Sequence, residues 1–344
     1  MATIILADDG SPYDGNSIQQ GPLGGAETAF VKLAEALAEI GNEVTVFNNC
    51  KNSVLVNNVL WKNLKSKKPL TCDLFIANRA HSVISLIPKA KKRVFWIHNP
   101  ANYLIKWRYL SRLWWWKPII IFSSNFQAKS YPDWAPASRR VRIPYGISHE
   151  FLSTPKLTSP PKPKAIFTSS PLRSLDWLLD IWSTKIYPKV PNAELHLFSS
   201  PKTYGDFGRK KKVAMNDVLK KAYSLKKFGV VVNDVLPKAL LAKVLSGSRV
   251  LLYKGDLGET YCLALGESQA CGVPAVIQNI GCVAERIIDK KTGFVAPNDE
   301  IFAKQAVKIL NDDKLWRSMH NNAIKYQRSW TWLDAAKEFE KLIA

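Results

Sequence analysis

The 344-residue sequence has few cysteines, and their spacing builds neither a bridge nor a metal site. The five cysteines are Cys50, Cys72, Cys262, Cys271 and Cys282, an odd number without a Cys-x-x-Cys pair. This pattern argues against a disulfide framework and against a structural zinc site. We expect all five to be reduced residues with structural roles.

Long apolar runs, short repeats and low-complexity tracts are also absent. The longest apolar stretches, such as residues 118–122, fall well short of the roughly 18 residues that a membrane-spanning helix needs. The sequence starts directly in an apolar run at residues 4–6, with no basic segment before it. We therefore expect no signal peptide and a cytoplasmic location.

Acidic residues are scarce beside basic ones: 28 Asp and Glu stand against 49 Lys and Arg, a net charge of +21. Such an excess favours acidic partners, whether nucleotides, anionic membrane surfaces or nucleic acid. Because no RNP, zinc-finger or helix-turn-helix pattern accompanies it, we do not expect nucleic acid, and a basic nucleic-acid-binding protein is kept only as an alternative. The 47% apolar and 22% charged content is that of a globular protein.

Apolar periodicity predicts a parallel α/β sheet in the first part of the chain. Residues 4–7 form a predicted strand, 21–28 a glycine-rich turn, 26–40 a helix with apolar residues at helical spacing, and 43–47 a second strand. This order of elements is typical of parallel sheets. Further strands are predicted at 74–77, 93–97 and 119–122.

The same alternation begins again after a segment with four prolines. Strands are predicted at 165–168, 194–198, 229–232, 249–253 and 275–277, with a helix from Leu175. We expect an N-terminal domain over 1–150, a linker over 151–164, a second domain over 165–327, and a C-terminal helix over 328–344 that returns to the first domain. Two such domains leave a cleft at the carboxyl ends of their sheets, where α/β proteins bind ligands.

Gly24 and Gly25 lie in the turn between the first predicted strand and helix. Glycines there let backbone amides approach a phosphate or a sugar at a helix N-terminus. The turn lacks the Gly-x-Gly-x-x-Gly spacing of dinucleotide-binding proteins. An ordinary surface turn is the alternative.

Glu259 and Glu267 stand eight positions apart in a segment that predicts loop, helix and strand. If the helix begins near Thr260, the two are about 12 Å apart along its axis, comparable to the span from a sugar across a diphosphate to a ribose. Glu267 has apolar neighbours, where a carboxylate is costly unless hydroxyl groups donate to it. The amides that would face the diphosphate belong to Tyr261, Cys262 and Leu263.

The ordered set of motifs resembles the group 1 (family 4) glycosyltransferases of the GT-B fold over nearly the whole chain. The similar segments are 24–46 with its Gly-Gly-Ala-Glu opening, 143–147 (Ile-Pro-Tyr-Gly-Ile), 259–267, 272–274 and the late tryptophan-containing helix. The resemblance implies an α/β protein with two Rossmann-like domains whose parallel sheets face each other across a cleft. The N-terminal domain would be the acceptor side, and the C-terminal domain would bind the nucleotide sugar.

The resemblance implies roles for three residues. Glu267 would bind the ribose, and Glu259 would lie near the donor sugar. His98, in the segment Phe-Trp-Ile-His-Asn-Pro, would contact the donor sugar. A histidine that only caps the end of a strand is the alternative.

The phosphate-binding charges depart from the family pattern. The family often places an arginine and a lysine five positions apart after the first strand of the second domain. Arg173 fits the lysine position, but the arginine position falls on Thr168 or Ser169. One expected charge is therefore missing unless another residue, for example Lys254, replaces it.

The resemblance implies a retaining enzyme that moves a hexosyl group from a nucleotide-diphosphate sugar to a glycan or lipid-linked acceptor, as in polysaccharide biosynthesis. No Asp-x-Asp, the signature of metal-dependent GT-A transferases, occurs in the sequence. We therefore expect no metal and no cofactor, with the phosphate charge met by side chains and amides. A GT-B relative with epimerase or phosphorylase chemistry is the alternative.

Residues 103–117 mix aromatic and basic side chains, as interfacial helices do. On that interpretation the protein makes peripheral contact with the inner face of an anionic membrane. The alternative is a helix that packs its aromatic side chains against the first sheet.

Overall fold

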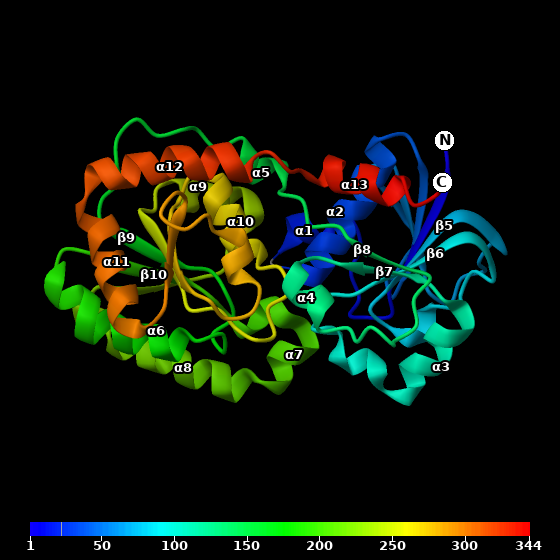
Figure 1. Ribbon diagram of the computed structural model, residues 1–344, viewed down its shortest axis with the longest axis horizontal. Helices are drawn as coiled ribbons and strands as arrows, with labels where there is room; N and C mark the ends of the chain where they lie inside the picture. Colours follow the sequence, from blue (N-terminus) through cyan, green and yellow to red (C-terminus); the bar gives the residue numbers. More distant parts are fainter. Residues whose placement is uncertain (22) are drawn as a thin grey trace. The chain divides into compact units, whose positions relative to one another are not determined.

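The computed structural model describes residues 1–21 and 23–344, without the side chains of 204–207. Pro22, in the turn predicted at 21–28, lies outside the described residues. The chain forms two compact units, Met1–Gly146 with Trp330–Ala344, and Ile147–Ser329 (Figure 1). The segment 151–164, expected to be a linker, thus belongs to the second unit, and the chain passes between the units at residues 146–147 and 329–330.

The first unit is built on an eight-stranded sheet in the order β3-β4-β2-β1-β5-β6-β7-β8. Only the β3–β4 pair is antiparallel among these described strands. The strands are β1 (Thr3–Ala7), β2 (Glu43–Asn48), β3 (Val54–Val56), β4 (Val59–Asn63), β5 (Thr71–Asn78), β6 (Lys89–Trp96), β7 (Ile119–Phe122) and β8 (Arg139–Arg142).

The central strands of this sheet are buried without alternation, as is typical of parallel sheets covered on both faces. All four residues of β7 are buried, as are the last four of β1. The helices are α1 (Ser17–Gln20), α2 (Gly25–Glu39), α3 (Trp107–Trp116), α4 (Asn125–Lys129) and α13 (Trp332–Glu340), with 3-10 turns η1 (His81–Val83) and η2 (Ala101–Ile105).

The C-terminal helix α13 is part of the first unit and lies beside α2 (Figure 1). A capping box between Thr331 and Asp334 starts it, so two orphan amides of its first turn are satisfied. Gly146 approaches the start of this helix so closely that a Cβ there would lie 2.2 Å from the backbone nitrogen of Trp332. The ring of Trp332 stacks on Tyr145, with centroids 5.9 Å apart.

The second unit is built on a six-stranded parallel sheet in the order β11-β10-β9-β12-β13-β14. Its strands are β9 (Lys164–Phe167), β10 (Glu194–Phe198), β11 (Val230–Asn233), β12 (Val250–Tyr253), β13 (Ala275–Gln278) and β14 (Gly293–Ala296). Its α-helices are α5 (His149–Leu152), α6 (Leu175–Ile181), α7 (Gly205–Lys210), α8 (Lys212–Ser224), α9 (Lys238–Ser246), α10 (Leu263–Ala270), α11 (Asp299–Asn311) and α12 (Asp313–Gln327). The short helical turns are η3 (Trp182–Ile186), η4 (Tyr187–Lys189), η5 (Pro201–Tyr204), η6 (Lys226–Phe228) and η7 (Val283–Arg286).

Two parallel α/β units confirm the predicted fold class, while the sequence pattern missed β3, β4, β8 and β14. The predicted start of a helix near Thr260 is wrong. Cys262 has a left-handed backbone conformation (φ 61°), so α10 begins only at Leu263. Glu259 therefore lies on the loop before the helix, and the expected 12 Å helical spacing between the two glutamates does not apply.

No helix in residues 1–21 and 23–344 is long and apolar enough to cross a membrane.

Candidate active site

In the second unit, a small cavity lies where the strand order reverses between β9 and β12. Ligands of α/β proteins bind at the carboxyl ends of strands at such points. The cavity is lined by Thr168 and Ser169 after β9, by the end of β12 and by the first turn of α10. The hydroxyl oxygen of Thr168 is buried and has no hydrogen-bond partner among the described residues. A polar group of a ligand could satisfy it.

Glu259 is buried, with 7% of its surface exposed, and it contacts Tyr253, which lines this cavity. Its Oε2 accepts hydrogen bonds from Arg173 and from the hydroxyl of Tyr253, at the end of β12. Burial and the neighbouring Glu259 carboxylate raise the pKa of Tyr253 well above its usual value, so this hydroxyl stays a donor. The structure thus joins two of the residues predicted from the sequence, and Arg173 is a counter-charge of Glu259.

The first turn of α10 presents its backbone amides beside the cavity, with Leu263 as the first helical residue. Unpaired amides at a helix start favour an anion. The predicted donors Tyr261 and Cys262 belong to the preceding loop. Arg286, which the sequence analysis did not select, lies over the Tyr261 ring at 4.3 Å and donates to its hydroxyl at 2.7 Å.

Glu267 lies on α10 and is also buried, with 4% of its surface exposed. Lys238, the first residue of α9, donates to both of its carboxylate oxygens, at 2.7 and 2.9 Å. Burial raises the pKa of Glu267, Lys238 acts to lower it, and Glu150 acts to raise it. On balance the pKa of Glu267 is raised, and its carboxylate lies where few water molecules compete with a hydroxyl donor.

Lys254 follows β12, and its described side-chain contact is with Trp177 of α6. Its ammonium group lies 4.5 Å from the centre of the Trp177 ring, whose nitrogen donates to Asp299 at 2.9 Å. Whether Lys254 supplies the missing phosphate charge stays a prediction.

The first unit holds the other predicted residues. Gly24 caps α2 and Gly25 is its first residue, so both lie at the predicted helix start. His98 follows β6 and is 7% exposed. Both of its ring nitrogens are engaged: Nε2 with Asn78 at 2.5 Å, and Nδ1 with the hydroxyl of Tyr145. To bond a sugar through its ring, His98 would have to give up one of these partners.

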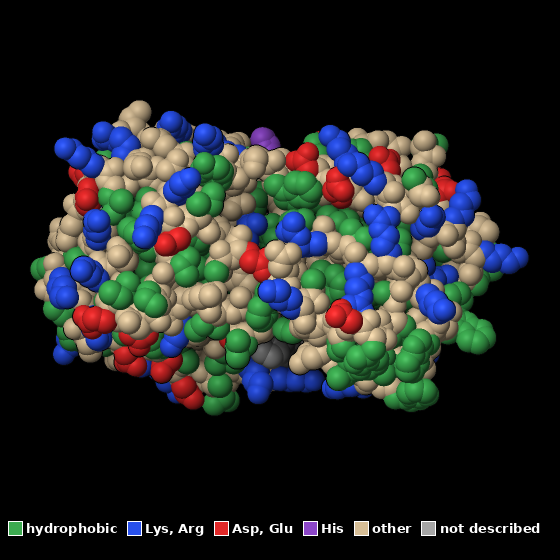
Figure 2. All heavy atoms as spheres, in the orientation of Figure 1, with side chains coloured by type: hydrophobic (Ala, Val, Ile, Leu, Met, Phe, Trp, Pro, Cys, Tyr) green, Lys and Arg blue, Asp and Glu red, His purple; other side chains and the backbone are tan. Residues whose placement is uncertain are grey.

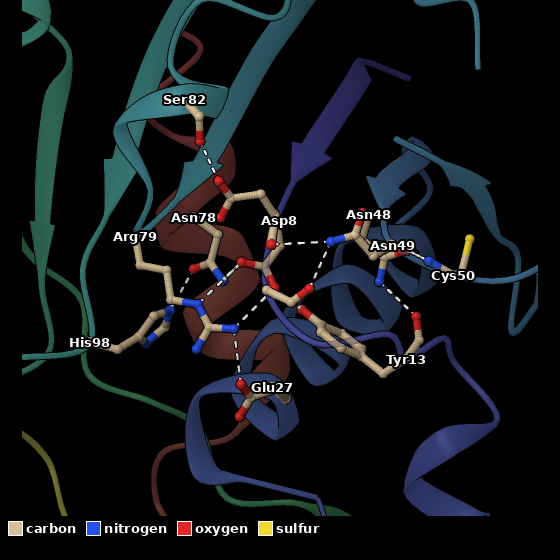
Figure 3. Close-up of polar contacts among 12 residues, drawn as sticks. Asp8, Tyr13, Glu27, Asn48, Asn49, Cys50, Asn78, Arg79, Ser82 and His98 are labelled. Carbon is tan, nitrogen blue, oxygen red and sulfur yellow. Dashed lines mark hydrogen bonds and ion pairs between the residues drawn. The ribbon is translucent and has the colours of Figure 1, made fainter. Parts of the chain in front are cut away.

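A buried polar network fixes the orientation of His98 (Figure 3). The Asp8 carboxylate accepts from the amide nitrogen of Asn78 at 3.1 Å and from Arg79 at 3.1 and 3.2 Å. The amide of Asn78 therefore turns its oxygen toward His98. Nε2 of His98 then carries the hydrogen, and Nδ1 accepts from Tyr145.

The same network continues to the start of α2. Arg79 pairs with Glu27 at 2.9 Å, and Tyr13 donates to Asp8 at 2.8 Å. Asp8 and Asn78 lie at the carboxyl ends of β1 and β5, where the strand order of the first sheet reverses. The sequence analysis missed this network, although a polar residue directly after each apolar strand was a signal for it.

Within the described part of the chain, no group of three or more His, Cys, Asp and Glu side chains could hold a metal ion. The five cysteines are buried and unpaired by disulfides. Burial raises the pKa of Cys271 to about 12, which keeps its thiol neutral.

Comparison with protein families identifies one match. Residues 218–326 match the family described as Glycosyl transferases group 1. This confirms the resemblance found in the sequence, and the matched region contains Lys238, Tyr253, Glu259 and Glu267. A search of curated protein sequences finds no match.

Solved structures share the fold over the full chain. Sucrose-phosphate synthase from Thermosynechococcus elongatus is 16% identical with a TM-score of 0.75, and the alignment covers 99% of this chain and 98% of that chain. Anabaena HepE in complex with UDP-glucose is 13% identical (TM-score 0.71, 99% of both chains). WaaG, a glycosyltransferase involved in lipopolysaccharide biosynthesis, is 13% identical (TM-score 0.67, 99% of both chains). These likenesses establish the GT-B arrangement of each sheet and its helices.

The buried state of His98 predicts how stability depends on pH. Burial, and then the charge of Arg79, lower the pKa of His98 well below 6.5. The unfolded chain takes up a proton below about pH 6.5, but folded His98 stays neutral, so stability falls as the pH drops through this region. The slope from one such group approaches about 1.4 kcal/mol per pH unit.

His98→Gln should therefore be less stable than the wild type near neutrality but lose less stability on acidification. Urea unfolding between about pH 5 and pH 7.5 measures both slopes. His149→Gln, at an exposed histidine, is the matched control and should keep the wild-type slope. Equal slopes for His98→Gln and the wild type would contradict the assignment.

Proposed function

From the match of residues 218–326 to the group 1 glycosyltransferases we propose that the protein transfers a hexosyl group from a nucleotide-diphosphate sugar to a glycan or lipid-linked acceptor. The observation that carries the proposal is the arrangement around α10. A cavity, a cationic side chain and a helix start meet there with two buried carboxylates. HepE, whose fold this chain shares, was solved with UDP-glucose, which supports a nucleotide sugar as the donor.

In this proposal the diphosphate lies at the first turn of α10, beside Thr168 and Arg173. The amides and the guanidinium would stabilise charge on the phosphate as the glycosidic bond breaks. The fork of Arg173 suits phosphate oxygens because it donates in pairs. Glu267 would accept the ribose hydroxyls, and Glu259, released from Arg173 by the phosphate, would face the donor sugar.

Retention of configuration and independence of metal are further parts of the proposal. Retention rests on the resemblance to families with two glutamates at this spacing. In such a mechanism the departing phosphate accepts the proton of the acceptor hydroxyl, and the acceptor oxygen takes the same face of the sugar that the phosphate leaves. Side chains and amides, rather than a divalent cation, would then meet the leaving-group charge.

A donor panel tests the function. The full chain is incubated with UDP-, ADP- and GDP-hexoses, with and without EDTA, and release of nucleoside diphosphate and glycosyl transfer are followed. We expect the enzyme to turn over at least one of these donors, and we expect EDTA not to reduce the rate of that turnover. Metal-reversible loss in EDTA would overturn metal independence, and turnover only with inorganic phosphate would indicate a phosphorylase instead.

Arg173→Ala should lower kcat by roughly a hundredfold, because a preorganised donor to the departing phosphate is lost. Arg173→Lys should restore part of it, since the charge returns without the fork. Arg142→Ala, an exposed arginine of β8, is the matched control. Steady-state kinetics on the best donor of the panel provides the measurement.

The Arg173–Glu259 pair makes a second comparison necessary. If Arg173 acted only by holding Glu259, Glu259→Gln would cost as much as Arg173→Ala, and the double variant would lose nothing more. We expect the double variant to be slower than either single variant. A folded Arg173→Ala enzyme with near-normal kcat would contradict the phosphate role.

We also propose peripheral contact with an anionic membrane through α3. Its inner face packs on the first sheet through the buried Tyr109, Leu110 and Leu113. Its outer face leaves Trp107 and Trp115 exposed at 72% and 81%. Figure 2 shows hydrophobic side chains gathered over α3, at the lower right. The basic residues exposed with them are Lys106, Arg108 and Arg112.

Trp116 differs from its neighbours. It lies against the core cluster of the first unit, with the guanidinium of Arg93 4.2 Å from the centre of its ring. The segment is therefore divided: one stripe of aromatic residues belongs to the core and the other faces outward. Only the outward stripe carries the membrane proposal.

The protein should sediment with vesicles of phosphatidylglycerol and phosphatidylcholine at low salt, and binding should weaken as salt screens the basic residues. A Trp107→Ser, Trp115→Ser double variant should bind less. Trp134→Ser, at a tryptophan outside α3 that is 62% exposed, is the matched control. If the wild type does not bind these vesicles at low salt, the membrane proposal is wrong, and the outer face of α3 is only a solvent-exposed surface.

A further inference from the structure

The ion pair between Lys238 and Glu267 joins two elements that are distant in sequence. Lys238 is the first residue of α9, and Glu267 lies in the middle of α10. The ammonium group donates to both carboxylate oxygens, at 2.7 and 2.9 Å, and lies 5.5 Å from the centre of the Phe151 ring. The lysine side chain keeps 25% of its surface exposed, whereas that of the glutamate keeps 5%.

Stability alone does not explain this pair. Removing two charges from water costs several kcal/mol per ion, and a buried pair often adds nothing over apolar residues of the same size. A carboxylate has about four lone-pair sites. Within residues 1–21 and 23–344, the hydrogen bonds to the side-chain carboxylate of Glu267 come from Lys238 alone, which occupies two of these sites. The remaining lone pairs of the Glu267 carboxylate can therefore accept further hydrogen bonds. A ligand with two adjacent hydroxyl groups could donate them.

We propose that Lys238 is a positioning residue for the nucleotide: it holds the Glu267 carboxylate ionised and in one orientation, so that the remaining lone pairs accept the two ribose hydroxyls of a nucleoside diphosphate. This inference rests on the proposed function, in which Glu267 binds the ribose. Lys238 acts through Glu267 and does not contact the reacting atoms.

The surroundings of Glu267 determine what the loss of Lys238 would do. Helix α10 packs against α5, α9, α12 and η7. The titratable and charged groups near Glu267 on these elements are Lys238, Glu150, His320 and Arg286, and Cys271 lies at the C-terminal cap of α10 itself. Burial lowers the pKa of His320 and raises that of Cys271, so neither gains charge near neutrality. Among these groups, Lys238 is the cation that acts to lower the pKa of Glu267.

Without Lys238, burial and Glu150 act on Glu267 unopposed, and both raise its pKa. Protonation turns one oxygen into a donor and removes acceptor sites that the ribose needs. The affinity of Lys238→Met for a nucleotide should therefore fall as the pH drops and recover as it rises. In the wild type, where Lys238 acts to lower the pKa of Glu267, the affinity should depend less on pH over the same range.

The experiment titrates UDP, ADP and GDP calorimetrically into the full-length wild type and variants between about pH 6 and pH 8.5. The phosphate of the nucleotide ionises near pH 6 in every case, so the affinity ratio of variant to wild type removes its effect. For the tightest nucleotide we expect Lys238→Met to bind roughly tenfold more weakly or worse at the acid end and to approach the wild type at the alkaline end. Lys238→Arg should restore a flat ratio.

Two controls separate this role from a structural one. Glu267→Gln should bind weakly at every pH, because no carboxylate remains to titrate. With 2′-deoxy-UDP, the loss caused by Lys238→Met should shrink, because one of the two hydroxyl groups is missing.

A pH-independent loss in Lys238→Met that Lys238→Arg does not restore would overturn the positioning role, as would unchanged affinity at every pH. If the wild type binds none of the three nucleotides, the proposed function itself fails. The two failures are therefore distinguishable.

Discussion

The candidate site of the second unit depends on holding two carboxylates inside the protein. Glu259 and Glu267 are 7% and 4% exposed, a depth at which an ionised group is stable only with a charged or hydrogen-bonding partner. Arg173 and Tyr253 hold the first, and Lys238 holds the second. Arg173 and Lys238 each stabilise a carboxylate, which can accept hydrogen bonds in a part of the protein that excludes most water. A ligand that brings phosphates and hydroxyl groups can take over these contacts at little additional desolvation cost.

Parallel sheets explain why the polar residues gather where they do. In each unit the apolar strands end at one edge, and the strand order reverses at β1 and β5 in the first unit and at β9 and β12 in the second. Asp8 and Asn78 occupy the first reversal, and Thr168 lines the second. The residues at the two points of strand-order reversal have different environments. The first reversal holds a hydrogen-bonded network that orients His98, whereas the second leaves a cavity and a hydroxyl, that of Thr168, without a hydrogen-bond partner among the described residues, beside a helix start.

Local pattern predicted what depends on neighbours in sequence. Apolar strands, the amphipathic α2 and the restart after the prolines gave the two α/β units, and motif order gave Glu259, Glu267 and Arg173. Contacts across long sequence separations were not predictable. Nothing in the segment around Lys238 pointed to Glu267, 29 positions later, and the pairing of Arg173 with Glu259 joins residues 86 positions apart. The late start of α10 was missed because one left-handed residue, Cys262, leaves no periodic signal.

The central claim is that the second unit binds a nucleoside diphosphate along α10, from its first turn to Glu267. A crystal structure of the full chain with the nucleotide that binds most tightly tests this claim most directly. The account predicts phosphate oxygens within hydrogen-bond distance of Arg173 and the amide of Leu263, and ribose hydroxyls donating to Glu267. A nucleotide bound with its ribose away from Glu267, or with its phosphates away from α10, would contradict it.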